Sequence, residues 1–393
     1  MLVLAAFALL CCEGSAAFMA SSFIQRLRTS SVRPIQLLRT QMHPHRLSTW
    51  RSSSRRAHIT SMARTFEFVP YGQKFESDKK SICVDGLVPG TSLQLTHWNG
   101  NETPKEYKAD LSTDIVLKFI HAELGSEKNK WNDAVVLNNH FDTDGLLSVW
   151  IMLNPEAAMK YERRMVDAAA AGDFDEWGLS DWGLQLDLAF SKLASQCDGD
   201  KQAYEKLLPM VEDILVNVDD REELWKEELD EMYKIFDMVC DDKIVTTRVF
   251  DERSKYTKNA GKIGDVGVVV HPPGSPKVNG KVLSRTFPIG QATDAQVIAR
   301  YLMAYEQPDG KFHYEYERPH HAWAETVKRA NLSKPNAPLI LENLGSEWTT
   351  AGLNGMTAIC KTQIPISKGP MEVAGELLDL ERSLLPVFIQ KGE

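Results

Sequence analysis

The sequence lacks the patterns of several large classes of protein. It has six cysteines and no Cys-x-x-Cys pair, which disfavours a zinc ribbon and a thioredoxin-like site. No apolar run reaches the ~20 residues that a membrane-spanning helix needs, so a polytopic membrane protein is excluded. A Gly-rich phosphate loop, a Gly-x-Ser-x-Gly elbow and a His-Glu-x-x-His helix are also missing from the sequence.

Beyond the N-terminal segment, acidic residues outnumber basic ones by 53 to 36. Residues 1–64 carry nine Arg, no Lys and one acidic residue, a net charge of +8, which leaves −17 for residues 65–393. A body of that charge repels nucleic acid and anionic lipid, and it has no Lys/Arg cluster interleaved with aromatic residues. We therefore expect no nucleic-acid partner. Phosphorylated small molecules stay compatible with an acidic body, because bound cations reverse the local charge.

Residues 1–64 have the composition of a targeting segment that is disordered or removed. The apolar stretch 1–10 and the small residues 14–17 are typical of a signal peptide, and the Arg- and Ser-rich remainder is typical of a transit peptide. The junction Ser15-Ala16-Ala17-Phe18 resembles the cleavage motif of plastid preproteins in algae with secondary plastids. This resemblance implies a bipartite leader and a chloroplast stromal location, with the mitochondrion as the alternative. We expect no membrane span in the mature protein.

After residue 64 the hydrophobic pattern predicts an α/β fold. Short apolar segments bounded by turn residues predict strands, and amphipathic or Ala-rich segments predict helices. We expect a central, mostly parallel sheet with flanking helices and a long helical insertion at about 182–240. The expected domains are an α/β domain (65–272) and a C-terminal α+β part packed on it (273–393). The predicted strands are 66–70, 81–84, 92–96, 134–137, 243–250, 265–270 and 312–317, and the predicted helices outside the insertion are 115–124, 145–153, 156–171 and 296–305.

One segment concentrates residue types that bind metals. The buried strand predicted at 134–137 is followed at 138–145 by Asn-Asn-His-Phe-Asp-Thr-Asp-Gly. Ligands bind at the carboxyl ends of parallel strands, and in extended backbone His140, Asp142 and Asp144 share one face. One imidazole and two carboxylates suit Mn²⁺, Mg²⁺ or Fe²⁺. The sequence therefore predicts a divalent metal site here, with Mn²⁺ or Mg²⁺ as the cofactor.

Residues 138–145 have two other interpretations. A calcium-binding EF-hand loop is set aside, because aligning Asp142 and Asp144 with its third and fifth positions puts His140 first and Ile151 twelfth. Those two positions require an acidic residue and a bidentate Glu. The second interpretation stays open: the two acidic residues are caps of the helix predicted at 145–153.

The pattern His-x-Asp-x-Asp-Gly-x-x-Ser at 140–148 resembles the first motif of the DHH (Asp-His-His) phosphoesterases. These are two-metal, usually manganese, hydrolases of phosphodiesters, pyrophosphate or polyphosphate. The resemblance covers residues 135–150 and implies that His140, Asp142 and Asp144 are metal ligands, with His140 and Asp144 in catalytic roles. The chain has no Asp-His-His tripeptide, which favours an alternative function, a non-catalytic metal- or ligand-binding protein.

A wider resemblance spans most of the body. The phrases at 95–100, 138–145, 154–157 and 171–174 resemble those of an uncharacterised, mainly bacterial protein family of unknown function. The resemblance implies that residues 66–390 act as one unit, and it implies no activity.

Five further residues are candidates for the site. His97 and His271 each follow a predicted strand, and Asp173 follows a predicted helix. His320 and His321 come just after the strand predicted at 312–317. For each of them a structural or surface role is the alternative.

Together these patterns predict a metal-dependent hydrolase of phosphate esters or anhydrides that acts on a small phosphorylated molecule. An amide hydrolase with the same metal cluster stays open as a third interpretation.

Overall fold

The computed structural model describes residues 64–124, 130–178, 180–251, 264–287, 298–319, 323–329, 336–350 and 358–384. The predicted targeting segment falls outside these residues, except for Arg64, and so do His320 and His321. Among the described residues, every helix is too short or too polar to cross a bilayer.

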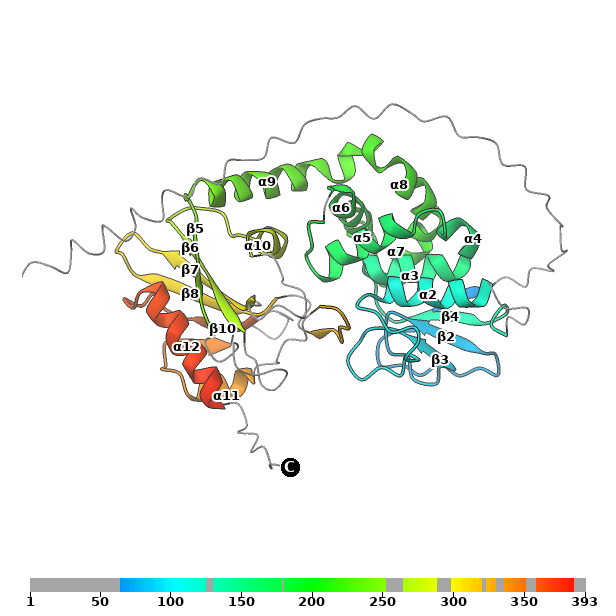
Figure 1. Cartoon of the computed structure of the whole chain (residues 1–393), viewed down its shortest axis with the longest axis horizontal. Coiled ribbons are helices and arrows are strands. Elements are labelled where there is room, and N and C mark those ends of the chain that lie inside the picture. Colours follow the sequence, from blue (N-terminus) through cyan, green and yellow to red (C-terminus); the bar gives the residue numbers. More distant parts are fainter. Residues whose placement is uncertain are drawn as a thin grey trace, which may run out of the picture. The chain divides into compact units, whose positions relative to one another are not determined.

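A four-stranded parallel sheet forms the first part of the fold (Figure 1). Its strands are β1 (Thr65–Phe68), β2 (Ser81–Val84), β3 (Leu93–Leu95) and β4 (Val135–Asn138), in the order β1-β4-β2-β3. Every residue of β2 and β4 is buried, because both faces of the sheet are covered. Cys83 pairs with Leu137, so the carboxyl ends of these two strands lie side by side.

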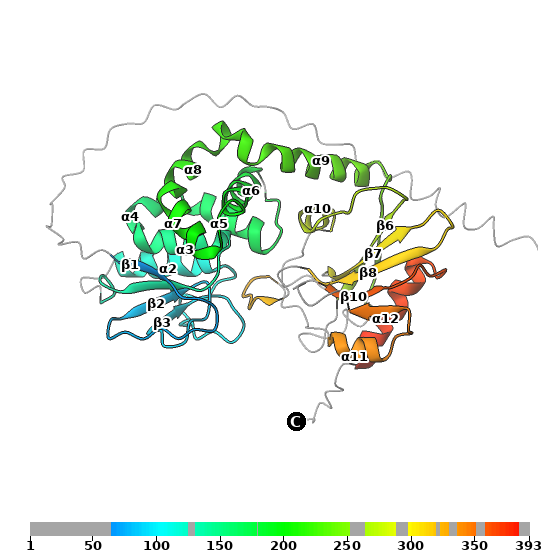
Figure 2. The ribbon, with the colours of Figure 1, turned by 180° about the vertical axis from the view of Figure 1, so that it is seen from behind.

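Helices cover one face of this sheet and loops cover the other. Figures 1 and 2 show α2 (Ser112–Leu124) and α3 (Thr143–Leu153) over the strands, and both pack on α5 (Glu162–Asp173). The opposite face is covered by Val69, Phe75 and Val88 from the connecting loops. The helix predicted at 156–171 is divided in two, into α4 (Pro155–Ala158) and α5.

The predicted helical insertion is present. It comprises α6 (Trp182–Ala194), α7 (Asp200–Leu207), α8 (Val211–Asn217) and α9 (Lys226–Cys240), together with short 3₁₀ turns. Each of these helices buries one apolar face, and α6 is the innermost, with nine of its thirteen residues buried against α5 and its neighbours.

A second sheet of six strands is mixed. Its order is β5-β6-β7-β8-β10-β9, and only β6 and β7 pair in parallel. On it pack α11 (Ala337–Glu342) and α12 (Pro370–Leu384), while α10 (Gly280–Thr286) contacts α9. The strands are β5 (Val245–Val249), β6 (Asp265–His271), β7 (Ile298–Glu306), β8 (Phe312–Glu317), β9 (Trp348–Thr350) and β10 (Ala358–Thr362).

The predicted helix at 296–305 is wrong, since residues 298–306 form strand β7. The first seven residues of β7 are all buried, because the strand lies between β6 and β8 and is covered on both faces. A strand buried on both sides shows no alternation of apolar and polar residues, and Ala, Leu and Met are good helix formers.

The α/β fold class is confirmed. The domain boundary after residue 272 stays a prediction, and the six-stranded sheet contains strands from both sides of it.

A buried ion pair joins α12 to the six-stranded sheet. The guanidinium of Arg300 on β7 is fully buried, and its Nη2 atom lies 2.8 Å from Oε2 of Glu381 on α12. The hydroxyl of Tyr316 on β8 donates to Oε1 of the same carboxylate at 2.6 Å. The charge of Glu381 is therefore satisfied from two strands at once.

Candidate metal centre

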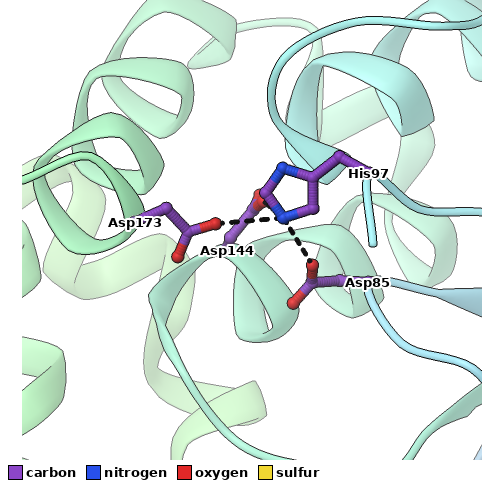
Figure 3. Close-up of side chains that lie close together, drawn as sticks. All are labelled: Asp85, His97, Asp144 and Asp173. Atoms are coloured by element: carbon purple, nitrogen blue, oxygen red, sulfur yellow. Dashed lines mark ion pairs between the residues drawn. The ribbon is translucent and has the colours of Figure 1, made fainter. Parts of the chain in front are cut away.

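Four side chains converge above the carboxyl ends of the parallel strands (Figure 3). Asp85 follows β2 and His97 follows β3, so both lie where ligands bind in open parallel sheets. Asp144 lies in the first turn of α3, directly after β4, and Asp173 is the last residue of α5. All four side chains are buried.

His97 is the centre of the first group. Its Nε2 atom lies 3.4 Å from Oδ1 of Asp85, 3.6 Å from Oδ2 of Asp144 and 3.2 Å from Oδ2 of Asp173. Its other ring nitrogen, Nδ1, lies 2.5 Å from the backbone carbonyl oxygen of Asp110. A carbonyl only accepts, so Nδ1 carries a proton, and in the neutral ring Nε2 presents its lone pair to the three carboxylates.

A second group shares Asp85 with the first. The Nε2 atom of His140 lies 3.0 Å from Oδ2 of Asp142 and 3.4 Å from Oδ2 of Asp85. The two oxygens of Asp85 therefore face different histidines, Oδ1 toward His97 and Oδ2 toward His140. Ligand atoms in each group lie within 4.8 Å of one another. Two groups of potential cation ligands therefore lie side by side and share the carboxylate of Asp85.

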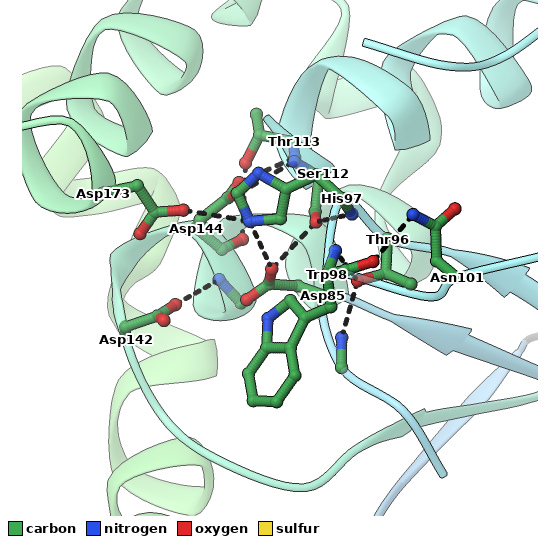
Figure 4. Close-up of polar contacts among 12 residues, drawn as sticks. Asp85, Thr96, His97, Trp98, Asn101, Ser112, Thr113, Asp142, Asp144 and Asp173 are labelled. Atoms are coloured by element: carbon green, nitrogen blue, oxygen red, sulfur yellow. Dashed lines mark hydrogen bonds and ion pairs between the residues drawn. The ribbon is translucent and has the colours of Figure 1, made fainter. Parts of the chain in front are cut away.

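Two of the acidic residues also cap helices (Figure 4). Oδ1 of Asp142 accepts the backbone N–H of Gly145 at 2.7 Å and so caps α3, which leaves Oδ2 facing His140. The two oxygens of Asp144 accept the N–H groups of Ser112 at 2.8 Å and Thr113 at 2.7 Å, at the start of α2. The capping interpretation therefore holds for Asp142, whereas Asp144 lies within α3 and accepts N–H groups from α2 instead.

Burial and the neighbouring carboxylates shift the pKa values of side chains in the first group. Burial, and then repulsion by Asp85, raises the pKa of Asp144 to about 6. Burial, and then repulsion by Asp142 and Asp144, raises the pKa of Asp173 well above its usual range. Burial lowers the pKa of His97, but contact with the Asp173 and Asp85 carboxylates outweighs burial and raises the pKa well above 6.5. Against the effect of burial, the two histidines in turn lower the pKa of Asp85, so positive charge on the group, from protons or from cations, favours its ionised carboxylates.

A model of the family of unknown function DUF6687 matches residues 64–369. The chain belongs to this family. No curated protein and no solved structure matches the chain. The DUF6687 match includes every strand of both sheets and all six residues of the two groups, and it ends just before α12.

The structure brings together five of the residues singled out in the sequence. His140, Asp142, Asp144, His97 and Asp173 all belong to the two groups.

The other candidates are placed differently. His271 lies at the end of β6, where its Nε2 atom accepts the N–H of Val278 at 3.2 Å and its ring stacks on Tyr305. It belongs to neither group, and His320 and His321 lie outside the described residues.

Asp85 is the site residue that sequence reasoning missed in this DUF6687 chain. Its signal is an Asp-Gly pair directly after the strand 81–84, which indicated only a turn. Asp85 has a φ of +44°, a left-handed conformation that Asp tolerates better than most residues. The turn is thus real, and the same residue points its carboxylate between the two histidines.

A cavity of about 960 Å³ opens beside the second group. His140, Asp142 and Asp173 line it on the side of the two groups. Residues of α6, α9 and α10 and the indoles of Trp98 and Trp323 form other parts of its wall. A cavity of this size can hold a small organic molecule.

Proposed function

We propose that the protein is a metal-dependent hydrolase of phosphate esters or anhydrides, with two divalent cations bound by the two groups that share Asp85. The observation that carries the proposal is the orientation of His97. Its Nδ1 proton is directed at the carbonyl of Asp110, and hydrogen-bonding of one ring nitrogen is the usual way in which proteins orient a histidine ligand.

The contacts around Nε2 of His97 support a cation between the four side chains. One N–H group can donate to one or two acceptors, but three carboxylates surround this nitrogen. Nε2 of His97, Oδ2 of Asp85 and Oδ2 of Asp173 are buried, and within the described residues none has hydrogen-bond geometry to a partner. Buried polar atoms are rarely left in this state, and a cation would satisfy all three.

The ligand types favour Mn²⁺ or Mg²⁺. The first group offers three carboxylates and one imidazole, and the second offers two carboxylates and one imidazole. Oxygen-rich ligand sets suit Mg²⁺ and Mn²⁺, and the imidazoles favour Mn²⁺ of the two. Cysteine is absent from both groups, which disfavours a closed structural zinc site.

Two adjacent cations suit hydrolysis at phosphorus, because they generate hydroxide from water and stabilise the charge of the leaving oxygen. In this proposal all six residues would act as ligands, and three of them, His140, Asp142 and Asp173, also line the cavity. The resemblance of residues 135–150 to the DHH phosphoesterases supports the choice of phosphate compounds as substrates. The alternative stays a non-catalytic metal- or ligand-binding protein.

Asp85→Asn is the sharpest test of the centre, since this carboxylate serves both groups. We expect the wild-type protein to retain two Mn²⁺ per chain by elemental analysis and the variant to lose at least one of them. Asp265→Asn is the matched control, since Asp265 is equally buried and pairs with Arg248 at 2.6 Å in the six-stranded sheet. Retention of two ions by Asp85→Asn contradicts the shared-ligand arrangement.

Activity is measured on the same preparations with p-nitrophenyl phosphate, bis(p-nitrophenyl) phosphate and pyrophosphate. We expect turnover that requires Mn²⁺ or Mg²⁺ and that Asp85→Asn abolishes. Two bound ions without turnover of any of the three compounds would favour the non-catalytic alternative.

A further inference from the structure

We infer that the substrate is a phosphodiester with a single negative charge whose retained ester group is aromatic, and that this group occupies the cavity beside His140. The inference rests on the proposed function and adds the substrate class to it. Its support comes from the shape, the wall and the charge of the cavity, none of which was needed to propose the metal centre.

The first argument is the position and size of the cavity. His140, Asp142 and Asp173 contribute both to the metal centre and to the cavity wall, so a phosphate at the ions has its ester group in the cavity. The volume of about 960 Å³ lies in the range of sites for drug-sized molecules. Pyrophosphate would leave most of this space unfilled.

The second argument is the chemistry of the wall. Trp98, Phe141, Leu188, Met232 and Trp323 give the cavity a mainly apolar lining. The indoles of Trp98 and Trp323 meet at 70°, with ring centres 5.7 Å apart, and they lie 4.8 Å from the His140 ring and 4.9 Å from the His97 ring, respectively. Aromatic groups stack or pack edge-on against such rings, which favours an aromatic ester over an aliphatic one.

The indole N–H groups add a polar requirement. The Nε1 atoms of Trp98 and Trp323 are both buried, and neither donates to an acceptor in the described part of the chain. An indole nitrogen is a donor only, so each N–H group calls for an acceptor that the described residues do not supply. Phosphate oxygens, or the oxygen and nitrogen atoms of a nucleobase, are acceptors of this kind.

The third argument is charge. The centre contains four carboxylates, those of Asp85, Asp142, Asp144 and Asp173, and two divalent cations would balance them without surplus. Among the described residues that line the rest of the cavity, Lys281 is the only Lys or Arg. Its Nζ atom is already 2.9 Å from Oδ2 of Asp187. A polyanion would find no excess positive charge, whereas a phosphodiester adds only one negative charge.

The reaction balances with water alone. The water oxygen forms a new bond to phosphorus, the bond from phosphorus to one ester oxygen breaks, and the departing alcohol takes up a proton. The products are an alcohol and a phosphomonoester that keeps the aromatic group. The monoester carries more negative charge than the substrate, so the same charge argument favours its release.

The test compares substrates that share one leaving group. The full chain loaded with Mn²⁺ is assayed with the methyl, phenyl and thymidyl esters of p-nitrophenyl phosphate and with p-nitrophenyl phosphate itself. We expect kcat/KM for the phenyl or thymidyl diester to exceed that for the methyl diester at least tenfold, and the monoester to be the poorest of the four. A thymidyl preference identifies a nucleotide, and a phenyl preference identifies an aryl ester.

Cavity variants give an independent measurement. Trp323→Leu should raise KM for the aromatic diesters several-fold and raise KM for the methyl diester by a smaller factor. Ser191→Trp, which fills the cavity from α6, should act in the same direction without touching the histidines. Trp182→Leu is the control, since this exposed indole on α6 is not part of the cavity wall.

The outcomes separate the two proposals. Equal rates on methyl and aromatic diesters, or a preference for pyrophosphate or the monoester, overturn the substrate inference and leave the metal-dependent hydrolase standing. Failure of Mn²⁺-loaded protein to hydrolyse any phosphate compound overturns the proposed function, and the substrate inference with it.

Discussion

Gly145→Ala tests whether Asp85 is held in place by the close approach of α3. A Cβ atom on Gly145 would lie 2.8 Å from Nδ2 of Asn138, 2.8 Å from Oη of Tyr204 and 3.0 Å from Oδ2 of Asp85. Attractive contacts of carbon begin at about 3.5 Å, so these neighbours must move by roughly half an ångström. Of these three neighbours, only Asp85 belongs to the candidate ligand groups, so its movement is the one expected to affect metal binding.

The effect of Gly145→Ala on folding and its effect on Mn²⁺ binding have different physical causes. Replacing Gly by Ala within a helix stabilises by about 1 kcal/mol, and overpacking costs about 1–3 kcal/mol, so the net loss of folding free energy is about 0–2 kcal/mol. Displacement of Asp85 affects both cation sites, because each of its oxygens serves one of them. We expect Mn²⁺ affinity to fall at least tenfold, which corresponds to about 1.4 kcal/mol.

Calorimetric titration with Mn²⁺ and thermal unfolding in EDTA measure the two effects separately. Gly375→Ala is the control, because Gly375 is also helical, on α12, and an added Cβ there meets nothing within 4 Å. The control should unfold at the same or a higher temperature and bind Mn²⁺ like the wild type. Unchanged Mn²⁺ affinity in Gly145→Ala would refute the role of close packing at Asp85.

Three further predictions concern metal removal, pH and the buried ion pair. Mn²⁺ at 100 times its Kd should stabilise the wild type by about 2.7 kcal/mol for each bound ion, and EDTA should remove this gain in thermal unfolding, with a smaller change in Asp85→Asn. Burial lowers the pKa of His271 from 6.5 to about 4, so the unfolded chain binds an extra proton between these values and stability falls as the pH drops. The loss should reach about 3 kcal/mol at pH 4 and be smaller in His271→Gln, and equal pH dependence in urea unfolding would contradict it. Glu381→Gln should cost about 3–5 kcal/mol in urea unfolding, because it leaves Arg300 buried with a neutral partner, and Arg300→Met combined with Glu381→Leu and Tyr316→Phe should recover most of that loss.

The sequence correctly predicted strands that have a clear hydrophobic pattern and flanking turn residues. The strands β2 and β8 have the predicted bounds, because each is short, apolar or alternating, and bounded by turn residues. β7 was mistaken for a helix, since burial on both faces removes the alternation that identifies a strand. The six-stranded sheet could not be predicted as one unit, because its pairings join segments far apart in the chain.

The candidate site likewise contains residues that local patterns identify and one residue that only long-range strand pairing places there. His140, Asp142 and Asp144 lie within five residues, so spacing alone singled them out, and His97 and Asp173 were found at the ends of predicted elements. Asp85 lies 55 residues before His140 and is brought to it only by the pairing of β2 with β4. Asp85 could have been assigned to the site only if the pairing of β2 with β4 had been known. That pairing is a property of the folded sheet.

Residues beyond the parallel sheet support the candidate metal centre. The carbonyl of Asp110 orients His97, and the carboxylate of Asp110 accepts backbone N–H groups from Val327, Lys328 and Arg329. The carbonyl of His97 itself accepts the N–H of Glu325 at 2.9 Å. Residues 325–329, which follow β8 in the chain, therefore hold His97 in two ways. They contact its backbone carbonyl directly, and they contact its ring through Asp110. A chain that ended at residue 272 would keep all six ligands and lose these contacts, so it should bind Mn²⁺ more weakly than the full chain even if its own sheet folds.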